Sequence, residues 1–71
     1  MSWNYRVLSE DFFGEPYLRI HEVYYNKKSR KGDAFALKAA TVEGDNIEEL
    51  RGILNKMIKA LDKKILIAKD I

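Results

Sequence analysis

Few side chains in this sequence could do chemistry, and His21 is the first to consider. It is the only histidine among 71 residues, and its neighbour Glu22 suggests an acid/base pair. Successive side chains of a strand point to opposite faces of a sheet, so these two groups cannot form a dyad directly. We therefore interpret His21 as an ordinary strand histidine on an open sheet face.

Other signatures of catalysis or metal binding are missing from the sequence. The absence of cysteine removes disulfides, thiolate ligands and cysteine nucleophiles. The glycines are isolated, so they form no phosphate-binding loop. One histidine with scattered carboxylates matches no recognised ligand spacing, and we expect neither a metal nor a cofactor. These observations predict a protein that is not an enzyme.

The densest cluster of charge lies at residues 27–31. Its basic members are Lys27, Lys28, Arg30 and Lys31. Beside Tyr24 and Tyr25, such a loop could grip a phosphate backbone while the rings stack on bases. The alternative, which we favour, is a solvated loop that keeps the hairpin soluble. The net charge of +2 is too small to indicate nucleic acid by itself.

A row of aromatic and basic side chains on one predicted strand is the other candidate binding site. Tyrosine and arginine are enriched at the energetic centres of protein interfaces. Alternate residues of a strand share one face, so the row could bind a protein partner or a second copy of the chain, as could a strand edge. The members of the row are Tyr17, Arg19, His21 and Tyr25, with Arg6 available from the first strand.

Three predicted strands would position these groups. Aromatic and β-branched residues favour strands at residues 3–8 and 17–26, and a short third strand at 34–37. On the second strand, Leu18, Ile20, Glu22 and Tyr24 share a face that we expect to be core, leaving the row of Tyr17 to Tyr25 on the open face. Phe12 and Phe13 fall in the connection at residues 9–16. They either fold back over the core, which we favour, or form an exposed apolar knob.

The second half of the sequence predicts one amphipathic helix, over residues 47–62. Asn46 is a good N-cap, with Glu49 placed to complete a capping box. Apolar residues at spacings of three and four draw a single stripe, which we expect to be the largest stabilising unit. Close contact with the sheet would explain Gly52 inside the helix. Residues 65–67 form either a short fourth strand or an apolar tail.

Together these elements predict one α+β domain over residues 1–71. Its architecture is a three-stranded antiparallel sheet in β-β-β-α order, with the helix packed on one face. At this length the core is thin. No apolar run is long enough to span a bilayer and no signal-peptide pattern is present, so we expect a cytoplasmic protein.

The sequence resembles a group of small bacterial proteins of unassigned function. The shared stretches are W-N-Y-R-V at residues 3–7, I-H-E-V-Y-Y at 20–25 and A-L-D-K at 60–63. This resemblance covers most of the length and implies no activity.

A second resemblance, to antitoxins of the HicB class, rests on G-D-x-x-E-E at residues 44–49, following the strands and opening the helix. It implies a truncated RNase H-like sheet with one helix, and a role in neutralising a small partner or binding RNA-related proteins. The sequence departs from that class at Ile71, where it ends without a DNA-binding appendage, so we do not expect promoter binding or autoregulation.

From the residues themselves we predict a small non-enzymatic binding or regulatory module. It would act through its open sheet face or a strand edge, on a protein partner or on a second copy of itself. The alternative is a nucleic-acid-binding module that uses the basic loop at residues 27–31.

Overall fold

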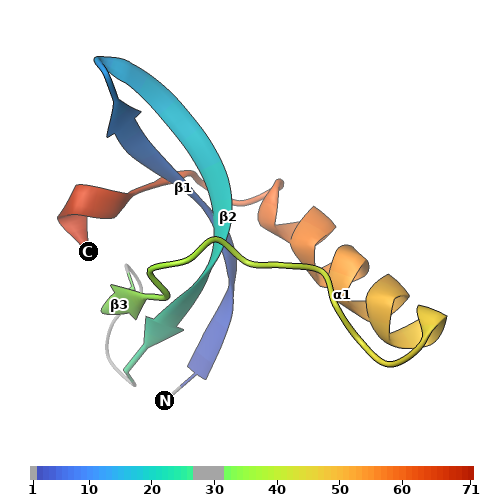
Figure 1. The fold of residues 1–71 in the computed structure, drawn as a ribbon. Coiled ribbons are helices and arrows are strands. Elements are labelled where there is room, and N and C mark those ends of the chain that lie inside the picture. Colours follow the sequence, from blue (N-terminus) through green and yellow to red (C-terminus); the bar gives the residue numbers. More distant parts are fainter. Residues whose placement is uncertain (1, 27–31) are drawn as a thin grey trace.

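The computed structural model describes residues 2–26 and 32–71. A long hairpin of β1 (Ser2–Phe12) and β2 (Glu15–Tyr25) is followed by the short strand β3 (Ala34–Phe35). The helix α1 (Ile47–Ala60), the short strand β4 (Leu66–Ile67) and the 3-10 turn η1 (Ala68–Asp70) complete the order of elements (Figure 1). The structure confirms the α+β class and the single long helix.

The sheet has four strands in the order β3-β2-β1-β4. The pairs β1–β2 and β2–β3 are antiparallel, whereas β4 lies parallel to β1. The prediction of a purely antiparallel three-stranded sheet is therefore wrong by one strand. For residues 65–67 the sequence allowed either a short strand or an apolar tail. The structure has the strand, at Leu66 and Ile67.

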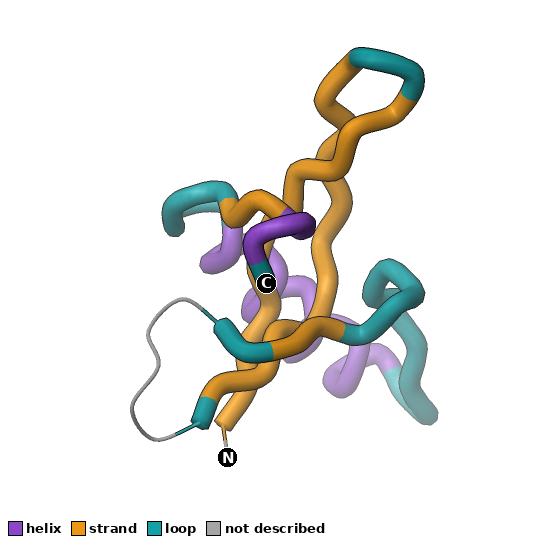
Figure 2. Tube along the Cα trace, turned by 90° about the vertical axis from the view of Figure 1, so that its left-hand side faces the viewer, coloured by secondary structure: helices purple, strands orange, loops and turns teal. Residues whose placement is uncertain are grey.

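The β1–β2 hairpin is longer than the sequence predicted. Its register runs from Ser2 opposite Tyr25 to Phe12 opposite Glu15, so most of the expected connection at residues 9–16 is strand. β4 accompanies β1 only at Leu8 and Ser9, and β3 pairs with the other end of β2. Beyond these short strands the hairpin continues as a two-stranded arm, which projects from the body (Figure 2).

The main core cluster lies on the face of β2 that we had predicted to be open, while Val7, Met57 and Ala60 are buried on the side of α1. Leu8 and Val23 are fully buried and form the core cluster with Ala68. Leu18, which we had placed in the core, is 52% exposed. The reason is the arrangement of the short elements, because β3 and η1 both close over one side of the hairpin while α1 lies on the other (Figure 1). Strand alternation alone does not reveal which face receives these elements.

The start of α1 agrees with the predicted cap. The Asn46 side-chain oxygen accepts a hydrogen bond from the Glu49 N–H at 2.9 Å. Glu49 reaches back to the Asp45 N–H at 2.7 Å, one residue before the cap, so the reciprocal bond is shifted from the usual capping box. Helix formation here is decided locally, which is why the sequence could predict it.

The apolar stripe of α1 is not the main stabilising unit. Met57 and Ala60 are its buried residues, while Ile47, Leu54, Ile58 and Leu61 are exposed. The explanation offered for Gly52 is also wrong, because a Cβ built there meets no atom of the sheet or of any other described residue within 4 Å beyond the neighbouring helix backbone. The helix contacts the sheet along only part of its apolar surface.

α1 is the only helix in the described ranges that is longer than a single turn. Among those residues, no helix combines the length and apolar character needed to cross a membrane.

Candidate functional site

The predicted row on β2 divides into a buried half and an exposed half. Arg6 and His21 are buried and Tyr25 is half-buried beneath the short elements that close over the sheet. Tyr17 remains 51% exposed on the projecting arm, with Arg19 beside it. The expectation of one continuous open face is wrong because β3 and the C-terminal segment cover its middle.

Arg6 organises the buried half. Its Nη2 donates to the carbonyl oxygen of Lys64 at 2.6 Å, and its Nη1 donates to the hydroxyl of Tyr25 at 3.2 Å. Tyr25 in turn donates to Asn4 Oδ1 at 2.7 Å. These contacts join β1, β2 and the segment before β4, so Arg6 and Tyr25 help to hold these parts of the fold together.

His21 has a neighbour that sequence reasoning missed. Its Nδ1 lies 2.8 Å from the Ala36 carbonyl oxygen, which can only accept, so Nδ1 carries the hydrogen. Its buried Nε2 has no hydrogen-bond partner among the described residues and lies 3.6 Å from Glu10 Oε1. Glu22 points to the opposite face and accepts from the Tyr24 hydroxyl at 2.8 Å. Glu10 could have been identified as a neighbour of His21 only from the register of the β1–β2 hairpin.

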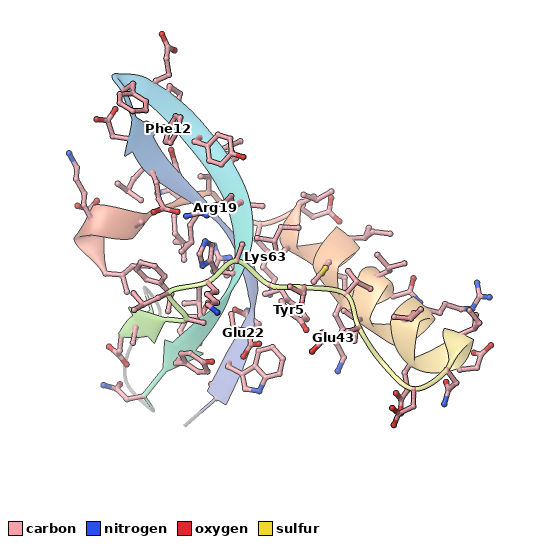
Figure 3. The ribbon with its side chains drawn as sticks, viewed as in Figure 1. Tyr5, Phe12, Arg19, Glu22, Glu43 and Lys63 are labelled. Carbon is pink, nitrogen blue, oxygen red and sulfur yellow. The ribbon has the colours of Figure 1, made fainter. Side chains whose placement is uncertain are left out.

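The exposed half is organised by Glu10 and Arg19. Arg19 Nη2 donates to Glu10 Oε1 at 2.6 Å, and this hydrogen bond is the main cause that lowers the pKa of Glu10 below its usual value. The Arg19 guanidinium also lies 5.8 Å from the centre of the Tyr17 ring, within cation–π range. Figure 3 shows Arg19 nearer the body of the sheet and Phe12 towards the end of the arm. The Glu10–Arg19 ion pair thus lies directly beside the Tyr17 ring.

Three aromatic rings form the end of the arm, and we name Phe12, Phe13 and Tyr17 the aromatic tip. The rings of Phe12 and Phe13 meet edge to face at 4.7 Å, and Phe12 lies 5.5 Å from Tyr17. Phe13 is 92% exposed. The favoured expectation that Phe12 and Phe13 fold back over the core is wrong, and the exposed alternative is what the structure has.

The turn that carries Phe13 explains this exposure. Phe13 and Gly14 connect β1 directly to β2, with φ of 53° and 83°. Two central residues at positive φ are what a type I′ turn requires, and the pair Asn-Gly is the usual choice. Phenylalanine in this region costs about 1 kcal/mol or more. The chain therefore places a bulky apolar side chain where neither turn geometry nor burial favours it.

An open hollow adjoins the aromatic tip on the side closed by η1. Its volume is about 560 Å³, and its lining combines apolar residues with three charged ones. The lining residues are Ser9, Glu10, Asp11, Gly14, Pro16, Phe35, Ile67, Ala68 and Lys69.

A second hollow lies between β1 and α1, and we name it the lysine hollow. Its volume is about 310 Å³ and it is lined by Trp3, Asn4, Tyr5, Lys56, Lys59, Ala60 and Lys63. Trp3 and Tyr5 meet edge to face at 5.2 Å. Figure 3 shows Tyr5 between β1 and the helix. Burial raises the pKa of the Tyr5 hydroxyl, and the charge of Glu22 adds to the rise.

The basic residues Lys27, Lys28, Arg30 and Lys31 lie outside the described residues, so their predicted role stays a prediction. Within residues 2–26 and 32–71, no group of three or more histidine, cysteine or acidic side chains is placed to hold a metal ion.

No family model, curated protein or solved structure matches this chain in the comparisons with known proteins.

Proposed function

We propose that this chain is a small non-enzymatic binding protein that inserts its aromatic tip into an apolar pocket of a partner protein. The observation that carries the proposal is Phe13, which is 92% exposed at the end of the arm with a positive φ. Strained positions are retained where function requires the geometry. Burying a phenylalanine is worth roughly 1.5 to 3 kcal/mol, enough to anchor an interface.

The charges around the aromatic tip indicate which kind of partner surface it would fit. Asp11 and Glu15 flank the turn and are exposed, whereas Arg19 is already paired with Glu10. The rim is therefore acidic, and it complements an apolar pocket bordered by lysine or arginine.

The arm favours recognition by side chains over the addition of a partner strand. Pro16 in β2 has no N–H, which removes a backbone donor from the part of β2 that lies opposite Asp11.

The test is a pull-down from lysate with tagged wild-type protein, with and without nuclease, read by mass spectrometry. Phe13→Asn removes the ring and supplies the Asn-Gly pair that the turn prefers, so loss of binding cannot be attributed to a damaged hairpin. Leu37→Asn is the matched control, since Leu37 is 87% exposed away from the tip.

The proposal requires a nuclease-resistant partner that binds wild-type and Leu37→Asn protein. Phe13→Asn should weaken binding at least tenfold by calorimetry, which corresponds to about 1.4 kcal/mol. Tyr17→Ala and Arg19→Ala should weaken it too. Full binding by Phe13→Asn would overturn the proposal.

The second candidate function is nucleic-acid binding, supported by the lysine hollow. Trp3 and Tyr5 offer rings for stacking beside Lys56, Lys59 and Lys63. Trp3 is the only tryptophan, so its fluorescence should fall when a single-stranded oligonucleotide binds there. The affinity should decrease steeply with salt. Replacing Lys28 and Arg30 with alanine separates a contribution of the predicted loop from that of the hollow.

A further inference from the structure

The lysine hollow has the chemistry of the pocket that the aromatic tip requires. The proposed function gives the tip a partner pocket that is apolar inside and bordered by lysine or arginine. The lysine hollow fits this description, because it combines the rings of Trp3 and Tyr5 with three lysines. The described residues that line it include no acid. The chain therefore carries both an aromatic tip and a pocket of the matching kind.

The lysine hollow is large enough for the ring of Phe13. Its volume is about 310 Å³, whereas an apolar cavity of about 150 Å³ already holds a benzene ring. Trp3 is 47% exposed, so part of its surface remains for another ring to cover. Trp3 and Tyr5 meet edge to face at 5.2 Å, and aromatic rings favour such contacts. Phe13 would extend this aromatic cluster.

The aromatic tip cannot reach the lysine hollow of its own copy. β1 is one continuous strand over Ser2–Phe12, so it holds Tyr5 and Phe12 about 24 Å apart along the extended chain. Figure 3 shows Phe12 towards the end of the arm and Tyr5 between β1 and the helix. A tip that fills a lysine hollow must therefore come from another copy.

The charges at the two surfaces are opposite in sign. Asp11 and Glu15 are exposed on either side of the turn that carries Phe13. The three lysines of the hollow are exposed as well. Glu22, which lies opposite Tyr5, is not among the residues that line the hollow. The acidic surroundings of the tip thus complement the basic border of the hollow.

The larger hollow beside η1 suits a second tip less well. Its charged lining residues are Glu10, Asp11 and Lys69, so carboxylates outnumber ammonium groups. Gly14 and Pro16 also line it, which places the acidic tip of its own copy at its edge. A second tip would bring like charges together there, which disfavours the contact.

We propose that the partner of the aromatic tip is a second copy of this chain, whose lysine hollow receives Phe13. This inference deepens the proposed function and rests on it, because the same tip makes the contact. The tip and the hollow are different surfaces, so the contact is heterologous and each copy offers one surface to the next. Assembly therefore continues into a chain of copies or closes into a ring.

The first measurement is the mass of purified protein, free of nucleic acid, by sedimentation from about 10 to about 300 μM. The proposal requires a mass that rises with concentration above the chain mass of 8.3 kDa. Phe13→Asn should raise the dissociation constant at least tenfold, and Leu37→Asn should leave it unchanged. Added salt should weaken the association, because exposed charges are screened.

Two variants that each lack one surface give the sharpest test. Phe13→Asn removes the tip, and the double variant Lys56→Glu/Lys63→Glu reverses two charges of the hollow. All three positions are exposed, so helical circular dichroism should be unchanged. Each variant alone should stay monomeric, whereas their equimolar mixture should form a heterodimer of twice 8.3 kDa. Lys38→Glu/Lys69→Glu, at exposed positions outside the lysine hollow, is the matched control and should associate like the wild type.

Trp3 reports whether the lysine hollow is filled, because it is the only tryptophan of the chain. If the charge-reversed protein also carries Trp3→Phe, the tryptophan of the mixture lies in the intact hollow of the Phe13→Asn protein. Its emission should shift to shorter wavelength on mixing, since Phe13 of the other copy would cover it. A tip with Asp11→Lys and Glu15→Lys should bind the charge-reversed hollow more tightly than the wild-type hollow, a recovery that damage to the fold would not give.

Three outcomes would each overturn the inference: monomeric wild-type protein at about 300 μM, Phe13→Asn protein that associates as strongly as the wild type, or a mixture of the two variants that stays monomeric. The proposed function has its own outcome. A monomeric wild-type protein that retains a foreign protein in the pull-down, and loses it on Phe13→Asn, would reject the second copy as partner and support the proposed function. Undiminished binding of both a foreign protein and a second copy by Phe13→Asn would reject both.

Discussion

Glu10 and Arg19 form an ion pair of 2.6 Å that runs diagonally across the hairpin, since Glu10 lies opposite Tyr17 and Arg19 opposite Leu8. Diagonal neighbours in an antiparallel pair are within reach of a long side chain. The ion pair connects the exposed arm to the buried His21, whose Nε2 lies 3.6 Å from the same carboxylate oxygen.

The first prediction concerns the pH dependence of stability. The hydrogen bond from Arg19 lowers the pKa of Glu10 below its ordinary value of 4.5. A lowered pKa in the folded state contributes stability above the unfolded value, and this contribution is lost as the pH falls through the folded pKa. Glu10→Gln should therefore destabilise the protein at pH 7 and flatten the loss of stability below about pH 4.5.

Urea unfolding between pH 2 and pH 7 measures this effect, with Glu15→Gln on the same hairpin as the control. If Glu10→Gln retained the acid sensitivity of the wild-type protein, the ion pair would not be its source.

The second prediction concerns the turn. Phe13→Asn should stabilise the hairpin by about 1 kcal/mol, because asparagine tolerates positive φ better than phenylalanine does. The measurement is the urea midpoint at one protein concentration, with the slope unchanged. A lower midpoint would mean that the ring contact with Phe12 outweighs the backbone cost.

The third prediction concerns Gly52. Gly52→Ala should stabilise α1 by about 1 kcal/mol, because alanine is the better helix former and its Cβ would crowd none of the residues that the structure describes. Thermal unfolding followed by circular dichroism at 222 nm measures it. A destabilised variant would indicate a contact at residue 52 that is absent from the isolated chain.

The fourth prediction concerns Arg6. Arg6→Met should destabilise the fold by about 2 kcal/mol, because the Lys64 carbonyl and the Tyr25 hydroxyl both lose a charged donor. Lys38→Met, at an exposed position, should change stability by less than about 0.5 kcal/mol. Equal stability of the two variants would show that Arg6 contributes nothing beyond its packing.

Local signals in the sequence predicted the elements of this fold well. The Asn46 cap depends on residues within one helical turn, and the strands follow from aromatic and β-branched content. The faces of β2 could not be predicted this way. Whether His21 or Leu18 is buried depends on β3 and η1, which arrive from distant parts of the chain.

The candidate site shows the same division. Tyr17 and Arg19 were identified by residue type, and the structure keeps them at the surface. Their neighbours Phe12 and Phe13 were assigned to a connection, because Phe-Gly is not a usual turn pair and gave no sign of a two-residue hairpin. Their proximity to Tyr17 could be inferred only once the register of the β1–β2 hairpin was known.

The contact between Arg6 and Lys64 also constrains how the chain folds. These residues are 58 positions apart, whereas β1 and β2 are joined by a tight turn. Closing a long loop costs more entropy than closing a short one, so we expect the hairpin to form early and β4 to dock late.

The same segment should open first in the native state, with the fastest hydrogen exchange of any strand at Leu66 and Ile67. Each opening would expose the edge of β1 at Leu8, which makes this brief state, rather than global unfolding, the expected starting point of aggregation.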